Sequence, residues 1–245
     1  KVYAAASKSG ASVSVHKQTE RLGTAHAVLQ ARDEIAKGYD DVLALVGDAP
    51  LIGVDVLTEL RQGLADGADI VVAGFEAADP FGYGRMIVKD GELIAIVEEK
   101  EASDAQKQIT FCNGGLIAMN GKTALEMLEL IGNDNIKGEY YLTDIVEVCQ
   151  KMGKKSIAIS APEDDLMGCN TRSELSEIEA AWQSRKREEF MLSGVTMIDP
   201  TSVYLSYDTQ IGQDTVLEPN VWIGPGVTIE NDVQILAFSH IEGAT

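Results

Sequence analysis

One short stretch places a carboxylate where a ligand could bind. Gly47-Asp48 directly follows the apolar run Val42–Val46, which has no helical period and predicts a parallel strand buried on both faces. A carboxylate at the carboxyl end of such a strand points into the crevice where open α/β sheets bind ligands. Asp48 is therefore a candidate binding residue. The alternative is that it caps the helix expected from about Val54.

A second candidate stretch runs from Gln18 to His26. Gly23-Thr24 precedes apolar residues at helical spacing between Ala25 and Ile35, which predicts a helix. The first N–H groups of a helix are unpaired and carry partial positive charge, so a nucleotide base or phosphate could dock there. The alternative is that Thr24 is an ordinary N-cap and His26 a plain helix residue.

The elements needed to position these residues alternate between strands and helices. After the strand before Asp48, the pattern predicts a helix over 54–64, a strand over 69–75, a hairpin turning at 89–92 and a strand over 156–160. Such alternation is typical of a parallel α/β layer. A short strand is also expected over 12–15, and the strand over 109–119 is interrupted by Asn113-Gly-Gly115, which indicates a bulge or a close ligand.

The last part of the chain has a different period. Thr171-Arg-Ser-Glu174 is a capping box and predicts the start of a long helix that links two domains. Beyond it, large aliphatic residues recur at every sixth position, which is a hexapeptide repeat and predicts a β-helix solenoid. These residues are Leu205, Ile211, Leu217, Ile223, Ile229, Ile235 and Ile241.

The totals exclude several classes of protein. The 245 residues carry 20 Lys and Arg against 39 Asp and Glu, a net charge of -19, so binding along nucleic acid or an anionic membrane is not expected. Three widely spaced cysteines, Cys112, Cys149 and Cys169, suggest neither disulfides nor a zinc site. No apolar run could span a bilayer and no signal peptide opens the chain, which predicts a cytoplasmic protein.

Seven motifs, in this order over nearly the whole chain, together with the hexapeptide repeat, resemble the bacterial bifunctional N-acetylglucosamine-1-phosphate uridyltransferase and glucosamine-1-phosphate acetyltransferase family. Each motif is weak alone, and the ordered set is specific. They are Gln18…Leu22-Gly-Thr-Ala-His26, Gly47-Asp-Ala-Pro-Leu51, Gly82-Tyr-Gly-Arg85, Ile96-Val-Glu98, Asn113-Gly-Gly115, Gly138-Glu-Tyr-Tyr-Leu-Thr-Asp144 and Gly168-Cys-Asn-Thr-Arg172.

The resemblance implies a role for each site residue. Uracil would be held by Gln18, Gly23 and Thr24, and Mg²⁺ by Asp48 and Asn170. Asp48 would thereby be the catalytic metal ligand for direct attack of the sugar phosphate on the α-phosphorus of UTP. The residues implied to hold N-acetylglucosamine-1-phosphate are Gly84, Glu98, Asn113, Tyr141 and Thr143.

The resemblance also implies the domain organisation. A Rossmann-like nucleotidyltransferase domain with a mixed, mainly parallel sheet would occupy residues 1–170, a linking helix 171–193, and the first coils of a left-handed parallel β-helix 194–245. The family's opening phosphate loop has no match here and its later acetyl-transfer coils are absent. We therefore expect a chain truncated at both ends that lacks the loop needed to cradle the triphosphate. The longer protein would be a homotrimer through the β-helix and would use acetyl-CoA as a second co-substrate.

Other functions compete with this prediction. The nearest is a sugar-1-phosphate nucleotidyltransferase with a β-helix tail that uses a different sugar or base. Another is a non-catalytic trimeric assembly module that only senses nucleotide, and a third is a plain acyltransferase, for which the large α/β part would be superfluous. The family often has Asn-Thr-Gly where this chain has Asn113-Gly-Gly115, and Gly114 is expected to have little effect.

Overall fold

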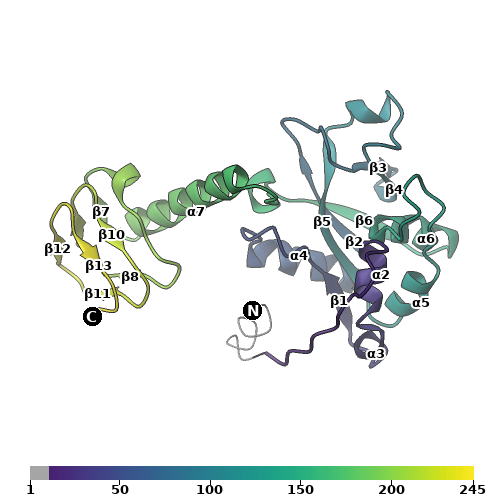
Figure 1. Cartoon of the computed structure of the whole chain (residues 1–245), viewed down its shortest axis with the longest axis horizontal. Helices are drawn as coiled ribbons and strands as arrows, with labels where there is room; N and C mark the ends of the chain where they lie inside the picture. Colours follow the sequence, from purple (N-terminus) through teal and green to yellow (C-terminus); the bar gives the residue numbers. More distant parts are fainter. Residues whose placement is uncertain (1–10) are drawn as a thin grey trace. The chain divides into compact units, whose positions relative to one another are not determined.

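The structure is a computed structural model that describes residues 11–245 (Figure 1). The chain divides into two compact units, Lys1–Met167 and Gly168–Thr245, and each is described by itself.

The first unit is built on one six-stranded mixed sheet. Its strand order is β4-β3-β5-β2-β6, and β1 pairs with β5 on the same side as β3, further along that strand. β2 lies between β5, which runs antiparallel to it, and β6, which runs parallel. The strands are β1 (Asp41–Ala44), β2 (Ile70–Glu76), β3 (Arg85–Lys89), β4 (Glu92–Val97), β5 (Phe111–Asn120) and β6 (Ser156–Ser160).

A mixed sheet was predicted correctly, but its direct pairings are mostly antiparallel rather than parallel. β1, β2 and β6 share one direction, as strand and helix alternation requires. However, β5 is inserted between β1 and β2 in the opposite direction, and β3 and β4 form the predicted hairpin. Alternation gives the direction of crossover strands, and it does not reveal a strand inserted between them.

The prediction that residues 42–46 form a parallel strand buried on both faces is wrong. β1 ends at Ala44, pairs antiparallel with β5 and is only partly buried along its whole length. Leu45 and Val46 are exposed. In the described part of the chain, β1 has β5 as its single paired neighbour, so its outer edge lacks the cover that full burial requires.

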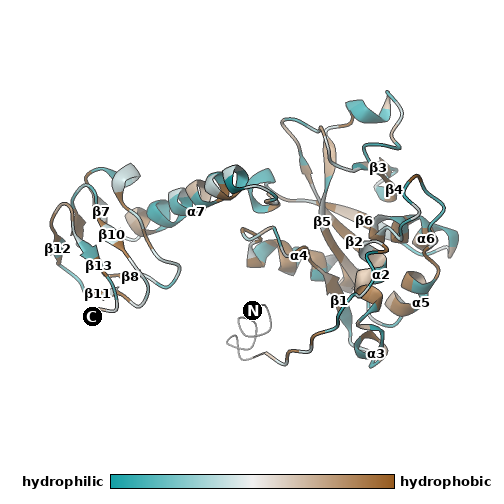
Figure 2. Cartoon of the chain, viewed as in Figure 1, coloured by the Kyte–Doolittle hydropathy of each residue, from teal (hydrophilic) through white to brown (hydrophobic). Residues whose placement is uncertain are grey.

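Helices cover both faces of this sheet and produce two separate cores (Figure 2). Successive residues of β2 point to opposite faces. Ile70 and Val72 pack into a core with α2, α5 and α6, whereas Val71, Ala73 and Phe75 pack into a core with α4. The helices of this unit are α2 (Thr24–Leu29), α3 (Arg32–Ile35), α4 (Val54–Ala65), α5 (Ala124–Glu129) and α6 (Ile145–Lys151).

Two local predictions near the beginning of the chain need correction. The helix expected between Ala25 and Ile35 is divided into α2 and α3, because the chain turns at residues 30–31. Residues 12–15 form no strand and are largely exposed, since alternation without a partner strand does not suffice.

The interruption in β5 is a bulge. Gly74 of β2 pairs with Asn113, but the preceding Ala73 pairs with Leu116, so β5 has two extra residues between these pairs. These are Gly114 and Gly115, and Gly115 has φ +77°, a conformation that favours glycine. The bulge predicted from the two glycines is therefore confirmed.

The second unit begins with the predicted capping box. The side chain of Thr171 accepts from the Glu174 backbone N–H, and the Glu174 carboxylate accepts from the Thr171 N–H. This box starts α7 (Arg172–Leu192), whose buried residues are Ile178, Gln183 and Phe190. Phe190 belongs to the core of this unit.

Short parallel strands then stack at a fixed spacing. Gln210 pairs with Thr228, Val216 with Gln234 and Trp222 with His240, each pair being 18 residues apart. Of the hexapeptide residues, Leu205, Leu217, Ile223 and Ile229 are buried, and the other three pack against the same core. The strands are β7 (Thr196–Met197), β8 (Gln210–Ile211), β9 (Val216–Leu217), β10 (Trp222–Ile223), β11 (Thr228–Ile229), β12 (Gln234–Ile235) and β13 (His240–Ile241).

Candidate active site

The segment that enters α2 is bound to residues 140–142 through its backbone. The Tyr140 N–H donates to the Leu22 carbonyl at 2.8 Å, and the Ala25 N–H donates to the Tyr140 carbonyl at 3.0 Å. Gly23 lies between these bonds with φ +112°, and a Cβ there would lie 2.4 Å from the Tyr140 carbonyl oxygen. Only glycine allows this close approach. Two motifs that are more than a hundred residues apart are thereby brought into contact.

Gln18 is oriented by two groups of the same segment. Its Nε2 donates to the Gly23 carbonyl at 3.0 Å and to Nδ1 of His26 at 3.0 Å. His26 was expected to be a plain helix residue. Its ring instead fixes the amide of a predicted nucleotide-binding residue, and its position in the Leu22–His26 motif was the available signal.

Thr24 is not an N-cap, contrary to the alternative considered from the sequence. The N-cap of α2 is Gly23, and Thr24 is the first helical residue. The Thr24 hydroxyl accepts from the Leu142 N–H at 2.9 Å. It therefore links the start of α2 to the Gly138–Asp144 motif.

The predicted sugar-phosphate residues converge at the ends of β3, β4 and β5. Glu98 Oε1 accepts from the Thr143 hydroxyl at 3.2 Å and lies 3.8 Å from where a Cβ on Gly84 would be. The Asn113 N–H donates to the Gly84 carbonyl at 2.9 Å. The Asn113 side-chain oxygen accepts from the Gly115 N–H at 3.0 Å, which holds it against the bulge.

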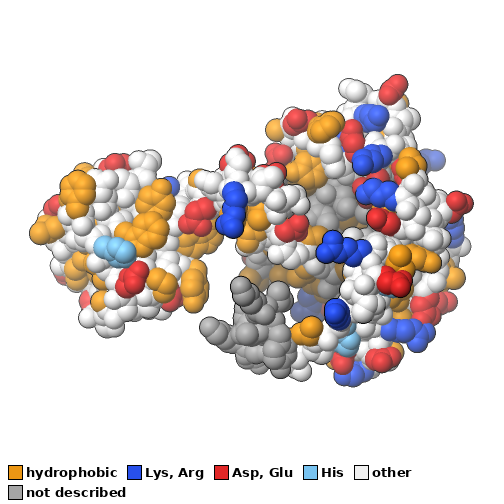
Figure 3. Space-filling model, viewed as in Figure 1, with side chains coloured by type: hydrophobic (Ala, Val, Ile, Leu, Met, Phe, Trp, Pro, Cys, Tyr) orange, Lys and Arg blue, Asp and Glu red, His pale blue; other side chains and the backbone are white. Residues whose placement is uncertain are grey.

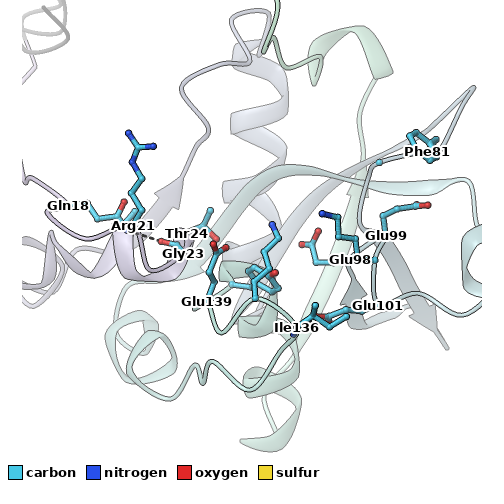
Figure 4. Close-up of a pocket in the computed structure, with 15 residues that line it drawn as sticks. Gln18, Arg21, Gly23, Thr24, Phe81, Glu98, Glu99, Glu101, Ile136 and Glu139 are labelled. Carbon is cyan, nitrogen blue, oxygen red and sulfur yellow. Dashed lines mark hydrogen bonds between the residues drawn. The ribbon is translucent and has the colours of Figure 1, made fainter.

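A cavity of about 710 Å³ lies between these two groups of residues (Figure 4). Figure 4 shows Gln18, Arg21 and Thr24 on one side and Glu98 and Glu99 on the other. Its volume is in the range of small-molecule and cofactor sites. Five predicted residues line it, namely Gln18, Gly23, Thr24, Glu98 and Tyr141.

Three cations that were not predicted line the same cavity. They are Arg21, Lys100 and Lys137, and the ammonium of Lys137 lies 5.9 Å from the centroid of the Tyr141 ring. Basic and acidic side chains are interspersed over the visible face of this unit (Figure 3). The three cations lie in or next to predicted motifs. The sequence does not reveal which Lys and Arg residues face a cavity, because that depends on the fold.

The acidic side chains of the cavity affect the titration of its tyrosine. Burial, and then the carboxylates of Glu139, Glu101 and Glu98, raise the pKa of Tyr141. Its hydroxyl therefore stays protonated at neutral pH and can both donate and accept a hydrogen bond.

Asp48 and Asn170 are not among the residues that line this cavity. Asp48 lies in the exposed turn after β1, and within residues 11–245 its carboxylate makes no hydrogen bond or ion pair. It does not cap α4, whose N-cap is Gly53, so that alternative is wrong. Asn170 is exposed and belongs to the second unit.

A family described as nucleotidyl transferase matches residues 2–182. The chain belongs to this nucleotidyl transferase family. The family assignment agrees with the Rossmann-like α/β sheet of the first unit.

Curated relatives extend the similarity beyond the first unit. Proteins named "Bifunctional protein GlmU" are 57% identical over 243 residues in Sinorhizobium fredii and 55% in Sinorhizobium medicae, covering 99% of this chain and 53% of each relative. The protein of the same name in Agrobacterium fabrum is 54% identical and covers 99% of this chain and 54% of the relative. The nucleotidyl transferase chain thus spans about half the length of these relatives.

A solved nucleoside-diphosphate-sugar pyrophosphorylase from Vibrio cholerae RC9 gives a TM-score of 0.47 with 17% identity over 66% of either chain, which is too low a similarity to inform the site. No helix among residues 11–245 combines the length and apolar character needed to cross a membrane.

Proposed function

We propose that the first unit transfers UMP from UTP to N-acetylglucosamine-1-phosphate, giving UDP-N-acetylglucosamine and pyrophosphate. The observation that supports the proposal is the pairing of residues 22–25 with residues 140–142, beside a cavity whose lining includes Gln18, Gly23, Thr24, Glu98 and Tyr141. The name and 54–57% identity of the curated relatives support the same activity.

The two substrates would occupy opposite sides of the cavity. Gln18, Gly23 and Thr24, which lie together at one end of the cavity, would hold the uracil, and the Gln18 amide offers it hydrogen-bonding groups. The sugar phosphate would lie against Glu98, Asn113, Gly84, Tyr141 and Thr143. Among these, the Glu98 carboxylate is the acceptor for sugar hydroxyl or amide N–H groups.

The reaction needs positioning rather than a covalent nucleophile. A phosphate oxygen of N-acetylglucosamine-1-phosphate forms a bond to the α-phosphorus of UTP. The bond between that phosphorus and the oxygen bridging to the β-phosphorus breaks, and pyrophosphate leaves with the electron pair of this bond. Holding both substrates in line and neutralising their charge account for such catalysis. Arg21, Lys100 and Lys137 are the cations of the cavity that can neutralise phosphate oxygens.

The proposed metal is Mg²⁺ with Asp48 as its ligand in the first unit, and substrate oxygens and water would complete its shell. The donor chemistry fits, because a carboxylate oxygen suits this hard cation and Asp48 has no competing partner within residues 11–245. Bound Mg²⁺ would neutralise charge on the reacting phosphates. Asp48 would thus act in catalysis as a metal ligand.

For the whole protein we propose further features that involve the second unit. The 18-residue parallel register and the hexapeptide core support the start of a left-handed parallel β-helix. Later coils of this β-helix, in a longer protein, would carry acetyl transfer from acetyl-CoA to glucosamine-1-phosphate, and the β-helix would form a cytoplasmic homotrimer. Tyr204 stacks on Trp222 with ring centroids 5.3 Å apart, and both rings are about half exposed, which supports a contact surface on this unit.

The decisive experiment compares two glutamates in similar settings. Glu98 accepts from Thr143 inside the cavity, whereas Glu76 accepts from Thr110 at 2.8 Å outside it. Binding of UDP-N-acetylglucosamine to this chain and pyrophosphate release by a version lengthened at both ends are measured for E98Q and E76Q. We expect E98Q to lose roughly 10-fold or more in both, because a charge-assisted hydrogen bond is removed, and E76Q to match wild type. Equal behaviour of the two variants would contradict the proposal.

A substrate panel separates the alternatives. Pyrophosphate release with a different sugar phosphate or base would favour another sugar nucleotidyltransferase. Nucleotide binding without release by the lengthened protein would favour the assembly module.

A further inference from the structure

Among residues 11–167, the most deeply buried cation is Arg85, the first residue of β3. Its side chain is 2% exposed, and Nε, although buried, has no hydrogen-bond partner. A buried ion with an unpaired N–H is not what stability alone favours, because apolar residues of similar volume often serve at least as well. The environment of Arg85 therefore suggests a role in placing other groups.

The guanidinium of Arg85 joins three segments. Nη1 donates to the Tyr83 carbonyl, and Nη2 donates to the Glu99 carboxylate at 2.7 Å and to the Lys107 carbonyl at 3.4 Å. Tyr83 immediately precedes Gly84, Glu99 immediately follows Glu98, and Lys107 lies in the turn η2 (Gln106–Gln108) that leads into β5.

The backbone of Arg85 lies in register with the same region. It pairs with Val97 of β4 on one side and with Cys112 of β5 on the other. The next residues along these strands are Glu98 and Asn113, both proposed to hold the sugar phosphate. The hydrogen-bond partners of the Arg85 side chain do not include the residues proposed to bind uracil. Gln18 bonds Gly23 instead, and Thr24 bonds Leu142.

Arg85 also balances charge beside the cavity. Glu98, Glu99 and Glu101 follow one another closely along the chain and all line the cavity. The ion pair with Arg85 holds the Glu99 carboxylate in place, while the adjacent Glu98 accepts a hydrogen bond from Thr143. Loss of the pair would release a carboxylate next to the proposed sugar contact.

We propose that Arg85 is a positioning residue for the sugar-phosphate half of the site: it fixes Gly84 and Glu98 from behind and so sets the affinity for the sugar phosphate but not for UTP. This inference rests on the proposed uridyltransferase function. A merely structural ion pair would affect folding, and its loss would not distinguish between the two substrates.

The test measures binding of N-acetylglucosamine-1-phosphate and of UTP separately, by calorimetry on the full 245-residue chain. The variants are R85K, R85M and E99Q, because R85K keeps the charge and E99Q removes the partner while preserving its shape. K154M is the matched control, since Lys154 pairs with Asp69 at 3.1 Å away from the cavity.

We expect sugar-phosphate affinity to fall about 10-fold in R85K and E99Q and about 100-fold in R85M, because small displacements of positioning groups have effects of this size. UTP affinity should change less than about 3-fold, and K154M should bind both ligands like wild type. If R85M does not fold, R85K and E99Q decide the question. Equal losses for both ligands, or no loss in R85K and E99Q, would overturn the proposal. Failure of the wild-type chain to bind the sugar phosphate while binding UTP would instead contradict the proposed function, and with it the substrate that Arg85 is assigned.

Discussion

The side-chain amide of Gln183 pairs with both backbone groups of Leu205. Its Nε2 donates to the Leu205 carbonyl at 2.8 Å, and its Oε1 accepts from the Leu205 N–H at 3.0 Å. One side chain of α7 thus does for the first coil of the repeat what a neighbouring strand does for the later coils. Helix α7 is therefore an integral cap of the second unit, which solenoids need at their ends.

Replacing Gln183 with Leu should destabilise this unit strongly. The substitution leaves two buried backbone groups unpaired, and we expect the free energy of unfolding to fall by about 2–4 kcal/mol. Both tryptophans, Trp182 and Trp222, lie in this unit, so tryptophan fluorescence during denaturant unfolding reports on it. The control is Q234L, because Gln234 is exposed and its side-chain amide donates to the Glu218 carboxylate rather than to a buried backbone group. A loss for Q183L no larger than for Q234L would contradict the cap.

Gly23→Ala should disrupt the cavity. Both Gly23 and Gly67 have positive φ, at +112° and +98°, but a Cβ on Gly23 meets the Tyr140 backbone whereas one on Gly67 meets nothing within 4 Å. Backbone strain alone is of order 1–3 kcal/mol. G67A should therefore lose about 1 kcal/mol and keep ligand affinity. We expect G23A to lose more stability and also UDP-N-acetylglucosamine binding, measured by thermal unfolding and calorimetry. Ligand binding by G23A at wild-type affinity would exclude the predicted role of this contact.

Gly114→Thr tests how the bulge is packed. A Cβ on Gly114 would lie 2.4 Å from a terminal methyl of Leu166, which is buried, and 3.0 Å from the Ala73 carbonyl oxygen. The structure therefore gives Gly114 a specific packing partner, although the sequence suggested that this position matters little. We expect G114T to lower the free energy of unfolding by about 1–3 kcal/mol, as overpacking does. Truncation of Leu166 should relieve part of this loss, so that G114T/L166A is more stable than the sum of the single changes. Strict additivity would show that Leu166 is not the obstacle.

Asp144→Asn should change how stability depends on pH. Burial first, and then Glu147, Glu101 and Glu98, raise the pKa of Asp144 from 3.8 to about 6. Between these values the folded state holds a proton that the unfolded state has released, so the free energy of unfolding falls as pH rises through this window. Converted directly, this pKa difference means that ionising Asp144 lowers the free energy of unfolding by about 3 kcal/mol. Because Asp144 is partly exposed to solvent, we expect about 1 kcal/mol.

The measurement is the difference in free energy of unfolding between D144N and wild type. We expect this difference to favour D144N increasingly from about pH 4 to pH 6 and then to level off. The control is D66N, because Asp66 is exposed at the end of α4, where Gln62 donates to it. A flat difference across this window would contradict the raised pKa.

The sequence was most informative where a local rule has a single physical solution. The Thr171–Glu174 box predicted the start of α7, and paired glycines predicted the bulge at Gly114–Gly115. The motif at Gln18–Thr24 was predicted as a binding segment, and these residues do line the cavity. In each case the information lies within a few residues of the chain.

The errors and omissions concern relationships between distant residues. The apolar run at Val42 and Leu43 indicates that these residues pack against other parts of the protein, but it does not indicate which strand pairs with them. In the structure β1 pairs antiparallel with β5 and is only partly buried. In the same way, nothing local to Arg85 reveals Glu99 and the Lys107 carbonyl as its partners. The alternative that Thr24 is an ordinary N-cap relied on its neighbours in sequence, whereas its hydroxyl accepts from the distant Leu142 N–H.

The 18-residue pairing that joins β8 to β11, β9 to β12 and β10 to β13 restricts how this part of the second unit can change in length during evolution. Removing or adding 18 residues leaves every remaining strand opposite an equivalent one, so Tyr204, Trp222 and His240 would still be succeeded by residues on the same side of the coil. Inserting or deleting six residues keeps the aliphatic residues inside but moves every later outward-facing residue to the next side of the coil. Inserting or deleting one residue exchanges inward-facing for outward-facing residues. Insertions and deletions in this unit should therefore occur as whole coils or be confined to its corners.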